Sequence, residues 1–119
     1  MNPCPAKDVP KDGTVLPTLA HYSGVQCSTA HITDQDNHCL WHASHSREEY
    51  GTSEWIHYTG TGYLIRLSAW THSRLKLKQL GLSKPARRLI AALQRRYGIT
   101  QIHLDALGEV LPGFPLFEW

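Results

Sequence analysis

The stretch WIHYTGTGYLIRLSA, residues 55–69, decides the fold. Apolar and polar side chains alternate on both sides of Gly60-Thr61-Gly62, which is typical of two strands, Trp55–Thr59 and Tyr63–Ala69, joined by a short turn where glycine permits positive φ. In the second strand every other side chain, from Tyr63 onward, is apolar. We therefore expect a sheet with one buried face and one face at least partly in contact with water.

A strand and a helix precede this hairpin. Apolar and polar side chains alternate over Gly24–His31 and predict a strand. Thr33 then stands at an N-cap position, and Asp36 lies three residues on, where its side chain can return a hydrogen bond to the N-cap backbone. The acidic side chains of this turn complement the helix dipole. We expect the helix to run to about Arg47.

A second helix and a last strand follow. Ser83 is placed to cap the helix, and Pro85 lies in its first turn, where a missing N–H costs nothing. Apolar residues recur at helical spacing over 86–97 and form one stripe, and Gly98 is a typical C-terminal cap. Ile99–Leu107 is the last predicted strand.

The predicted order is β-α-β-β-α-β, an α/β (α+β) two-layer sandwich with two helices on one face of a four-stranded sheet. We favour a ferredoxin-like version. Residues 70–82 are basic and irregular, which suits either an edge strand or a docked loop. The length predicts one domain, residues 21–119, after a Pro-rich N-terminal arm at residues 1–20.

Composition argues for a soluble cytoplasmic protein. No apolar run approaches the roughly 20 residues that a membrane span needs, and the first residues lack the apolar segment of a signal peptide. The three cysteines cannot all pair and form no C-x-x-C motif, so we expect thiols. Cys27 and Cys39 are expected to be buried as small apolar side chains.

Positive charge is concentrated in one part of the chain. Residues 55–100 contain nine Lys or Arg and no Asp or Glu, although the formal net charge is only +2. Such segregation attracts an anionic partner, which could be nucleic acid, an acidic protein surface or a phosphorylated ligand. The candidate partner-binding residues are Arg74, Lys76, Lys78, Lys84, Arg87, Arg88, Arg95 and Trp41. A solvated helix face is the alternative. Nucleic acid also suits this charge, but no motif for sequence-specific recognition is present.

Three histidines lie on one side of the first predicted helix. His38 and His42 are four residues apart, a spacing at which two imidazoles can chelate a transition metal, and His45 could complete the site. A zinc site at His38, His42 and His45 is one interpretation. A solvated histidine face and a partner-binding surface around Trp41 are the others. We otherwise expect no cofactor.

Motifs for catalysis are missing. Gly60-Thr61-Gly62 lacks the Gly-Lys of a phosphate-binding loop, and no G-x-S-x-G occurs. Asp105 could serve as an acid beside His103, but a turn-capping role before Gly108 is favoured. We therefore expect a protein that is not an enzyme.

Four segments carry a resemblance to a known family. They are Ser-Thr-Ala-His-Ile-Thr at 28–33, Leu82-Ser83, Leu104-Asp105, and Phe-Pro-Leu-Phe-Glu-Trp at 114–119. In these the chain resembles, from Val25 to Trp119, a family of small proteins without assigned activity that bacterial integrative and conjugative elements, plasmids and prophages encode. The His-rich helix and the basic segment 70–82 depart from that family.

This resemblance implies a mobile element inside a bacterium. Small proteins in that setting often inhibit host defences such as CRISPR or restriction systems. We therefore expect a non-enzymatic binding protein, an anti-CRISPR-like inhibitor that acts by occlusion through its basic surface. The partner that the resemblance implies is a bacterial protein or ribonucleoprotein complex with an anionic surface. A nucleic-acid-binding accessory factor and a zinc-binding protein are the alternatives.

Overall fold

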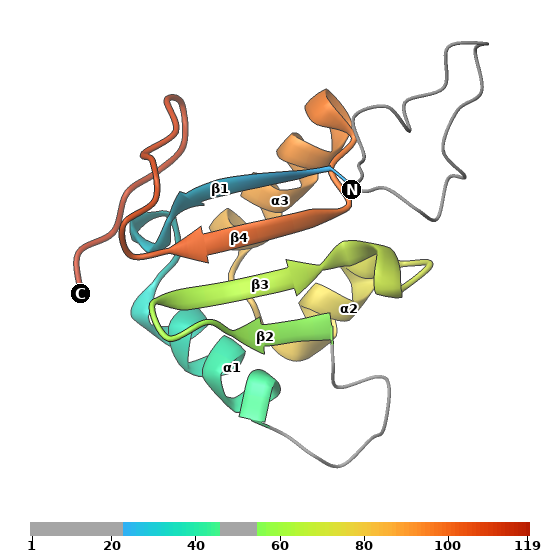
Figure 1. Ribbon diagram of the computed structural model, residues 1–119, viewed down its shortest axis with the longest axis horizontal. Coiled ribbons are helices and arrows are strands. Elements are labelled where there is room, and N and C mark those ends of the chain that lie inside the picture. Colours follow the sequence, from blue (N-terminus) through green and yellow to red (C-terminus); the bar gives the residue numbers. More distant parts are fainter. Residues whose placement is uncertain (1–22, 46–54) are drawn as a thin grey trace, which may run out of the picture.

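The computed structural model describes residues 23–45 and 55–119. Figure 1 shows the elements, which follow in the order β1 (Gly24–Ser28), the 3-10 turn η3 (Thr29–His31), α1 (Asp34–His45), β2 (Ile56–Tyr58), β3 (Gly62–Arg66), the 3-10 turn η5 (Leu67–Ala69), α2 (Ser73–Leu80), α3 (Lys84–Tyr97) and β4 (Gln101–Asp105). The predicted N-terminal arm, residues 1–20, and Arg47 lie outside the described residues.

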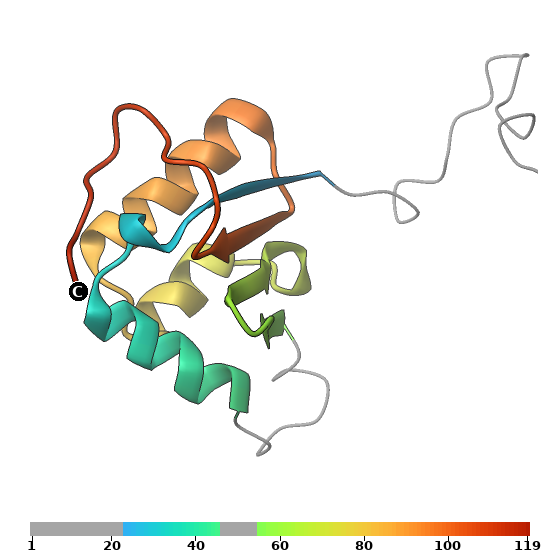
Figure 2. The ribbon, with the colours of Figure 1, turned by 60° about the vertical axis from the view of Figure 1, so that its left-hand side comes forward.

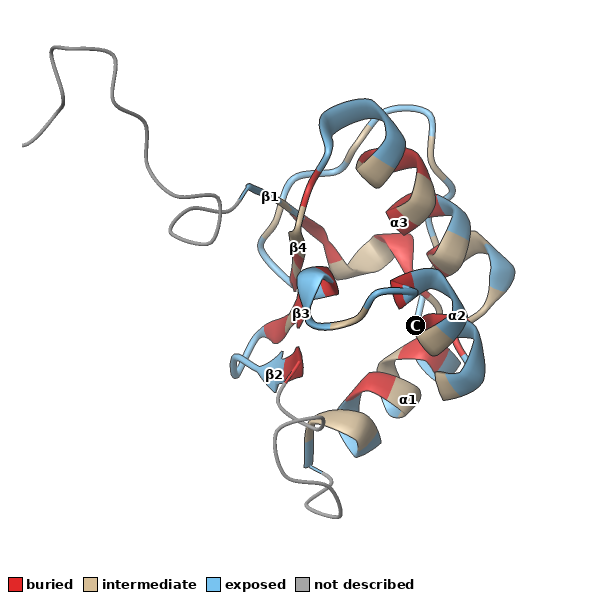
Figure 3. Ribbon diagram, turned by 90° about the vertical axis from the view of Figure 1, so that its right-hand side faces the viewer, coloured by how far each residue is buried: buried red, intermediate tan, exposed pale blue. Residues whose placement is uncertain are grey.

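The four strands form one mixed sheet in the order β1-β4-β3-β2. β1 is parallel to β4, whereas β4 pairs antiparallel with β3, and β3 pairs antiparallel with β2. All three α-helices pack on the same face of this sheet (Figures 2 and 3). The predicted two-layer α/β sandwich with a four-stranded sheet is therefore confirmed, with three helices in place of two.

The strand order differs from the ferredoxin-like version that we favoured. In a split βαβ fold, strands joined through a helix are parallel and another strand lies between them. Here β3 and β4 are antiparallel neighbours although helices connect them. The cause is the second helix in this connection, because α2 and α3 together let the chain enter β4 in the direction opposite to β3. The ferredoxin-like prediction is wrong for this reason.

The extra helix is α2, formed by residues that we expected to be an edge strand or a docked loop. Leu77 is buried and Leu80 partly so, while Leu75 is 51% exposed. The leucines therefore follow a helical period rather than the period of two that a strand requires. Gly81 ends the helix with a φ of 106°, a conformation that favours glycine.

Both predicted helix starts are confirmed. The backbone N–H of Thr33 donates to Asp36 Oδ2 over 3.0 Å, and the Asp36 N–H donates to Thr33 Oγ1 over 3.1 Å, which is the expected capping box. Ser83 caps α3 by accepting from the Ala86 N–H, and Gly98 closes the helix with a φ of 60°. The apolar stripe ends earlier than predicted, because Tyr97 is 65% exposed.

The strands end sooner than their apolar patterns suggest. β1 stops at Ser28 and gives way to η3, and β3 stops at Arg66 and gives way to η5. At the second place, the N–H groups of Leu67 and Ser68 both donate to the Thr100 carbonyl, so the chain turns away from the sheet. The face of the sheet toward the helices is apolar, with Ile65 and Ile102 fully buried (Figure 3).

The cysteines and the helices agree with two simpler expectations. Cys27 is buried and Cys39 partly buried, and both are free thiols. Both side chains pack in or against the apolar interior, and neither forms a disulfide bond. In the described part of the chain, no helix has the length and apolar character to cross a membrane.

Candidate functional site

The seven predicted cations divide between two neighbouring helices. Arg74, Lys76 and Lys78 lie on α2, and Lys84, Arg87, Arg88 and Arg95 lie on α3. Most of these side chains are exposed, whereas Lys76 and Arg87 are partly covered. A binding site requires that several of these side chains lie close together.

Four of the seven line one hollow between the helices, which we call the basic groove. It has a volume of about 270 Å³ and is lined by Arg74, Leu77, Lys84, Arg87, Arg88 and Ala91. Leu77 is buried beneath the cations and gives the hollow an apolar floor. The structure thus brings together guanidinium and ammonium groups that lie up to 14 positions apart in the sequence.

Helical spacing explains the α3 side of the basic groove. Lys84, Arg88 and Ala91 follow one another at intervals of four and three residues, so they lie along one side of the helix. The small side chain of Ala91 leaves room between the cations. Arg87 stands beside this line, and its Nε donates to the Leu82 carbonyl oxygen over 3.1 Å, which holds the side chain over the α2–α3 turn.

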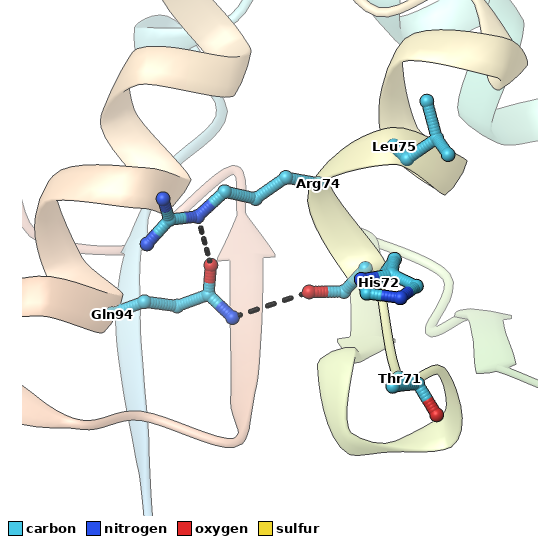
Figure 4. Close-up of a pocket in the computed structure, with 6 residues that line it drawn as sticks. Thr71, His72, Arg74, Leu75 and Gln94 are labelled. Carbon is cyan, nitrogen blue, oxygen red and sulfur yellow. Dashed lines mark hydrogen bonds between the residues drawn. The ribbon is translucent and has the colours of Figure 1, made fainter.

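Arg74 lines the basic groove on the α2 side, and Gln94 of α3 holds its side chain. Its Nε donates to Gln94 Oε1 over 3.4 Å, and Gln94 Nε2 in turn donates to Ser73 Oγ over 3.3 Å. These bonds span the space between the two helices (Figure 4). Because Nε is engaged, the terminal nitrogens of Arg74 remain the groups that can meet a ligand.

A second hollow, which we call the α2 pocket, adjoins the basic groove. Its volume is about 600 Å³, and it is lined by Thr71, His72, Ser73, Arg74, Leu75 and Gln94. In Figure 4, Arg74 and Gln94 extend toward each other between α2 and α3, whereas Thr71, His72 and Leu75 lie on the α2 side. Arg74 is common to both hollows, so they adjoin at this side chain.

Three predicted cations do not line the basic groove. Lys76 Nζ lies 4.0 Å from the centre of the Trp70 ring, a cation–π contact that turns it toward η5. Lys78 is four residues after Arg74 and so lies on the same side of α2. Arg95 continues the line of Arg88 along α3, seven residues further on.

No acidic side chain offsets this charge among the residues that the structure describes. In residues 23–45 and 55–119 the charged side chains in ion-pair contact are His103 and Asp105, with no Lys or Arg involved. Asp36, the acid nearest to α3, is buried and accepts its hydrogen bonds from Thr33 and Ser83. Within the described residues, the cations of the basic groove therefore have no carboxylate in ion-pair contact.

Trp41 belongs to a different surface. The helix α1 turns Asp36 and Leu40 inward and exposes His38, Trp41, His42 and His45, as its pattern predicts. The His45 ring stacks on Trp41 with 3.8 Å between ring centres, and the His42 ring meets Trp41 edge-on. Trp41 is 43% exposed and lines neither hollow.

The three histidines are not gathered into a metal site. His45 Nδ1 lies 2.7 Å from the Trp41 carbonyl oxygen, so this nitrogen is already engaged. Across the described residues no group of three or more His, Cys, Asp or Glu is arranged to hold a metal ion. In the described residues, His38, His42 and His45 are thus not gathered around one point, and Nε2 of His45 is not engaged by the bond at Nδ1.

Asp105 has the turn-capping role that we favoured. Its Oδ1 accepts from the Leu107 N–H over 2.8 Å, and its Oδ2 accepts from the Thr61 hydroxyl over 3.0 Å. The Leu107 N–H is the main reason that the pKa of this carboxyl lies below its ordinary value, with smaller contributions from Thr61 and His103. His103 Nε2 is 3.4 Å from Oδ2.

The sequence pattern missed five residues of the α2 pocket: Thr71, His72, Ser73, Leu75 and Gln94. The first four lie in the segment whose helix was not predicted, so their convergence could not be inferred. Gln94 was a neutral position between the apolar stripe and the basic side of α3. The glycine at position 81, a typical C-cap, was the signal that could have revealed α2.

Residues 24–119 match the model of a family of unknown function, described as the DUF5983 C-terminal domain. No curated protein and no solved structure matches the chain. The match covers all the strands and helices of the described structure.

Proposed function

The chain belongs to the DUF5983 family, whose function is unknown, and we propose that it is a non-enzymatic binding protein. It captures an anionic surface of a bacterial protein or ribonucleoprotein complex through the basic groove between α2 and α3. Binding occludes that surface. The residues that make the contact are Arg74, Lys84, Arg87 and Arg88.

One observation carries this proposal. Four cationic side chains from two helices line the same hollow, and no described carboxylate pairs with them. Ordinary exposed helices interleave charges of both signs, which reduces self-repulsion. Three of the four are arginines, whose planar fork of donors matches carboxylates and phosphates. An anion bound between these cations would offset their mutual repulsion.

The resemblance to proteins of mobile elements supports the choice of partner. A small chain that coats an anionic surface of a defence complex would block access to its nucleic acid or substrate. We therefore propose an anti-CRISPR-like mode of inhibition by occlusion. Helices α2 and α3 provide the groove for this contact.

A matched pair of charge reversals tests the proposal. We expect Arg88→Glu to abolish capture of the partner from a lysate of the native bacterium, because it puts a carboxylate into the basic groove. Arg96→Glu makes the same charge change on an exposed α3 residue that lines neither hollow, and should leave capture intact. Mass spectrometry identifies the captured chains, and thermal melting confirms that both variants are folded.

Capture by Arg88→Glu equal to that of the unaltered protein contradicts the proposal. The nucleic-acid alternative is tested separately by electrophoretic shifts on DNA and RNA at two salt concentrations. Direct phosphate contacts would make the shift weaken steeply with salt. A shift at low salt that Arg88→Glu removes, without capture of any protein, would favour the accessory-factor alternative.

A further inference from the structure

The two hollows on the α2–α3 surface differ in chemistry although they share Arg74. The basic groove is small, about 270 Å³, and is lined by four cations over the apolar side chains of Leu77 and Ala91. The α2 pocket is larger, about 600 Å³, and Arg74 is its sole Lys or Arg. A ligand that fills both must therefore carry its negative charge at one end.

The basic groove has the size and donors for one or two phosphate groups. Arg74, Arg87 and Arg88 each present a guanidinium, which can donate two parallel hydrogen bonds to phosphate oxygens. Lys84 adds a compact positive charge at the edge. A single carboxylate would leave most of this charge unmatched, whereas a diphosphate carries enough charge to balance it.

The α2 pocket suits an uncharged, partly planar body. Its volume lies within the range of small-molecule sites, which is about 300–1,000 Å³. Leu75, half-exposed, offers an apolar side chain, and the His72 imidazole offers a flat surface. The Thr71 hydroxyl can donate or accept, and the Ser73 hydroxyl, which accepts from Gln94, still has its proton to donate.

Arg74 stands where the two parts of such a ligand would join. The Gln94 side chain accepts from Arg74 Nε and donates to Ser73, so one amide fixes the arginine against the wall of the α2 pocket. The terminal nitrogens of Arg74 make no hydrogen bond to the residues drawn in Figure 4, and Arg74 also lines the basic groove. This orientation fits a phosphate bonded directly to the body in the α2 pocket.

We infer that the α2–α3 surface is a binding site for a phosphorylated nucleoside, with its phosphates in the basic groove and its nucleoside in the α2 pocket. The inference rests on the proposed function, since it names the anion that the basic groove takes. Two sources share this chemistry: a free nucleotide, and the 5′-phosphorylated end of a nucleic-acid strand, such as that of a ribonucleoprotein complex.

Calorimetry on the full chain with five probes tests the inference. They are adenosine 5′-diphosphate, uridine 5′-diphosphate, adenosine, inorganic pyrophosphate and an octanucleotide with a 5′-phosphate. We expect a phosphorylated nucleoside, free or at the strand end, to bind at least about tenfold more tightly than pyrophosphate, because the α2 pocket adds contacts. Adenosine alone should bind weakly. Tighter binding of the octanucleotide assigns the site to strand ends, and tighter binding of the diphosphates assigns it to free nucleotides.

Two variants measure the contribution of each hollow to binding separately. Arg74→Gln should weaken nucleotide binding by about 10- to 100-fold, because a charge-assisted hydrogen bond is lost. Leu75→Glu should remove the preference for nucleoside phosphates over pyrophosphate while pyrophosphate binding persists. Arg96→Gln, outside both hollows, should change neither affinity.

Equal affinity for pyrophosphate and for every nucleoside phosphate overturns the inference, as does an absence of binding to all five probes. Neither result removes the proposed function, which has its own readout. Capture of a partner from the lysate that remains sensitive to Arg88→Glu would then show that the basic groove binds an anion other than a phosphorylated nucleoside.

Discussion

The carboxylate of Asp36 at the start of α1 holds Ser83 at the start of α3. Oδ1 accepts from the Ser83 backbone N–H over 2.8 Å, and Oδ2 accepts from the Ser83 hydroxyl over 2.7 Å. The same Oδ2 accepts from Thr33, within the capping box of α1. One carboxylate that is 1% exposed therefore satisfies N–H groups at two helix starts, and it lies 47 positions before Ser83 in the sequence.

Replacing Asp36 should destabilise the fold more than the loss of an ordinary cap. Asp36→Ala leaves the N–H groups of Thr33 and Ser83 without acceptors, and we expect a loss of about 3 kcal/mol in the free energy of unfolding. Urea titration followed by circular dichroism measures it. Asp34→Ala is the control, because Asp34 is exposed in the same turn, and it should cost under about 1 kcal/mol. Equal losses in the two variants would show that Asp36 acts only through the helix dipole.

His31 should control the C-terminal segment. Its Nδ1 lies 3.0 Å from the Pro115 carbonyl oxygen, and its Nε2 accepts from the Leu111 N–H over 2.8 Å, so the ring joins two points of the C-terminal segment. His31→Ala removes both bonds. We expect a loss of about 2 kcal/mol in stability and much faster hydrogen exchange at the Leu111 amide.

Exchange rates at other amides provide the contrast for His31. The Ala86 N–H, bonded to Ser83 at the start of α3, should keep its protection in His31→Ala. His57→Ala, an exposed change on β2, should alter neither amide. Continued protection of Leu111 in His31→Ala would mean that other contacts, such as the bond from the Trp119 indole N–H to the Ile32 carbonyl, hold the segment by themselves.

Cys27 should resist alkylation in the folded protein. Burial raises the pKa of its thiol to about 11, so at pH 8 almost no thiolate is present, and the sulfur is out of reach of the reagent. Burial, followed by the negative charge of Asp36, also raises the pKa of Cys39, but that side chain is only partly covered. We expect iodoacetamide to modify Cys39 slowly and Cys27 only after unfolding in urea. Peptide mass spectrometry reads each site, and prompt labelling of Cys27 without urea would contradict its burial.

Local signals in the sequence predicted most of the fold. The Thr33–Asp36 capping box, the Ser83 cap and Gly98 act within one helical turn, so their effect can be inferred from neighbouring residues. The alternation in β3 likewise predicted that Tyr63 and Ile65 face the interior. By contrast, strand order depends on contacts between distant segments, which no local pattern encodes.

The site was predicted in part for a related reason. Counting Lys and Arg along the sequence identified the cations of the basic groove, because such a count does not depend on how the chain folds. It also included Lys76, whose contact with Trp70 depends on how η5 meets α2. The α2 pocket was missed because α2 has no polar N-cap side chain bond and no acid in its first turn. The ordinary signals of a helix start are absent there.

Asp105 should give the protein an acid-sensitive component of stability. The Leu107 N–H, and to a smaller extent Thr61 and His103, favour the charged carboxylate and lower its pKa in the folded state. A lowered pKa contributes stability that is present above the pKa of the unfolded chain and is lost as pH falls through the folded pKa. Asp105→Asn should therefore be less stable than the unaltered protein at neutral pH, and the difference should shrink steadily toward about pH 2. Urea titrations across this range measure it. The exposed Glu118, changed to Gln, serves as the control and should show no such trend. A difference between Asp105→Asn and the unaltered protein that stays constant down to the lowest pH would mean that the carboxylate acts through shape rather than charge.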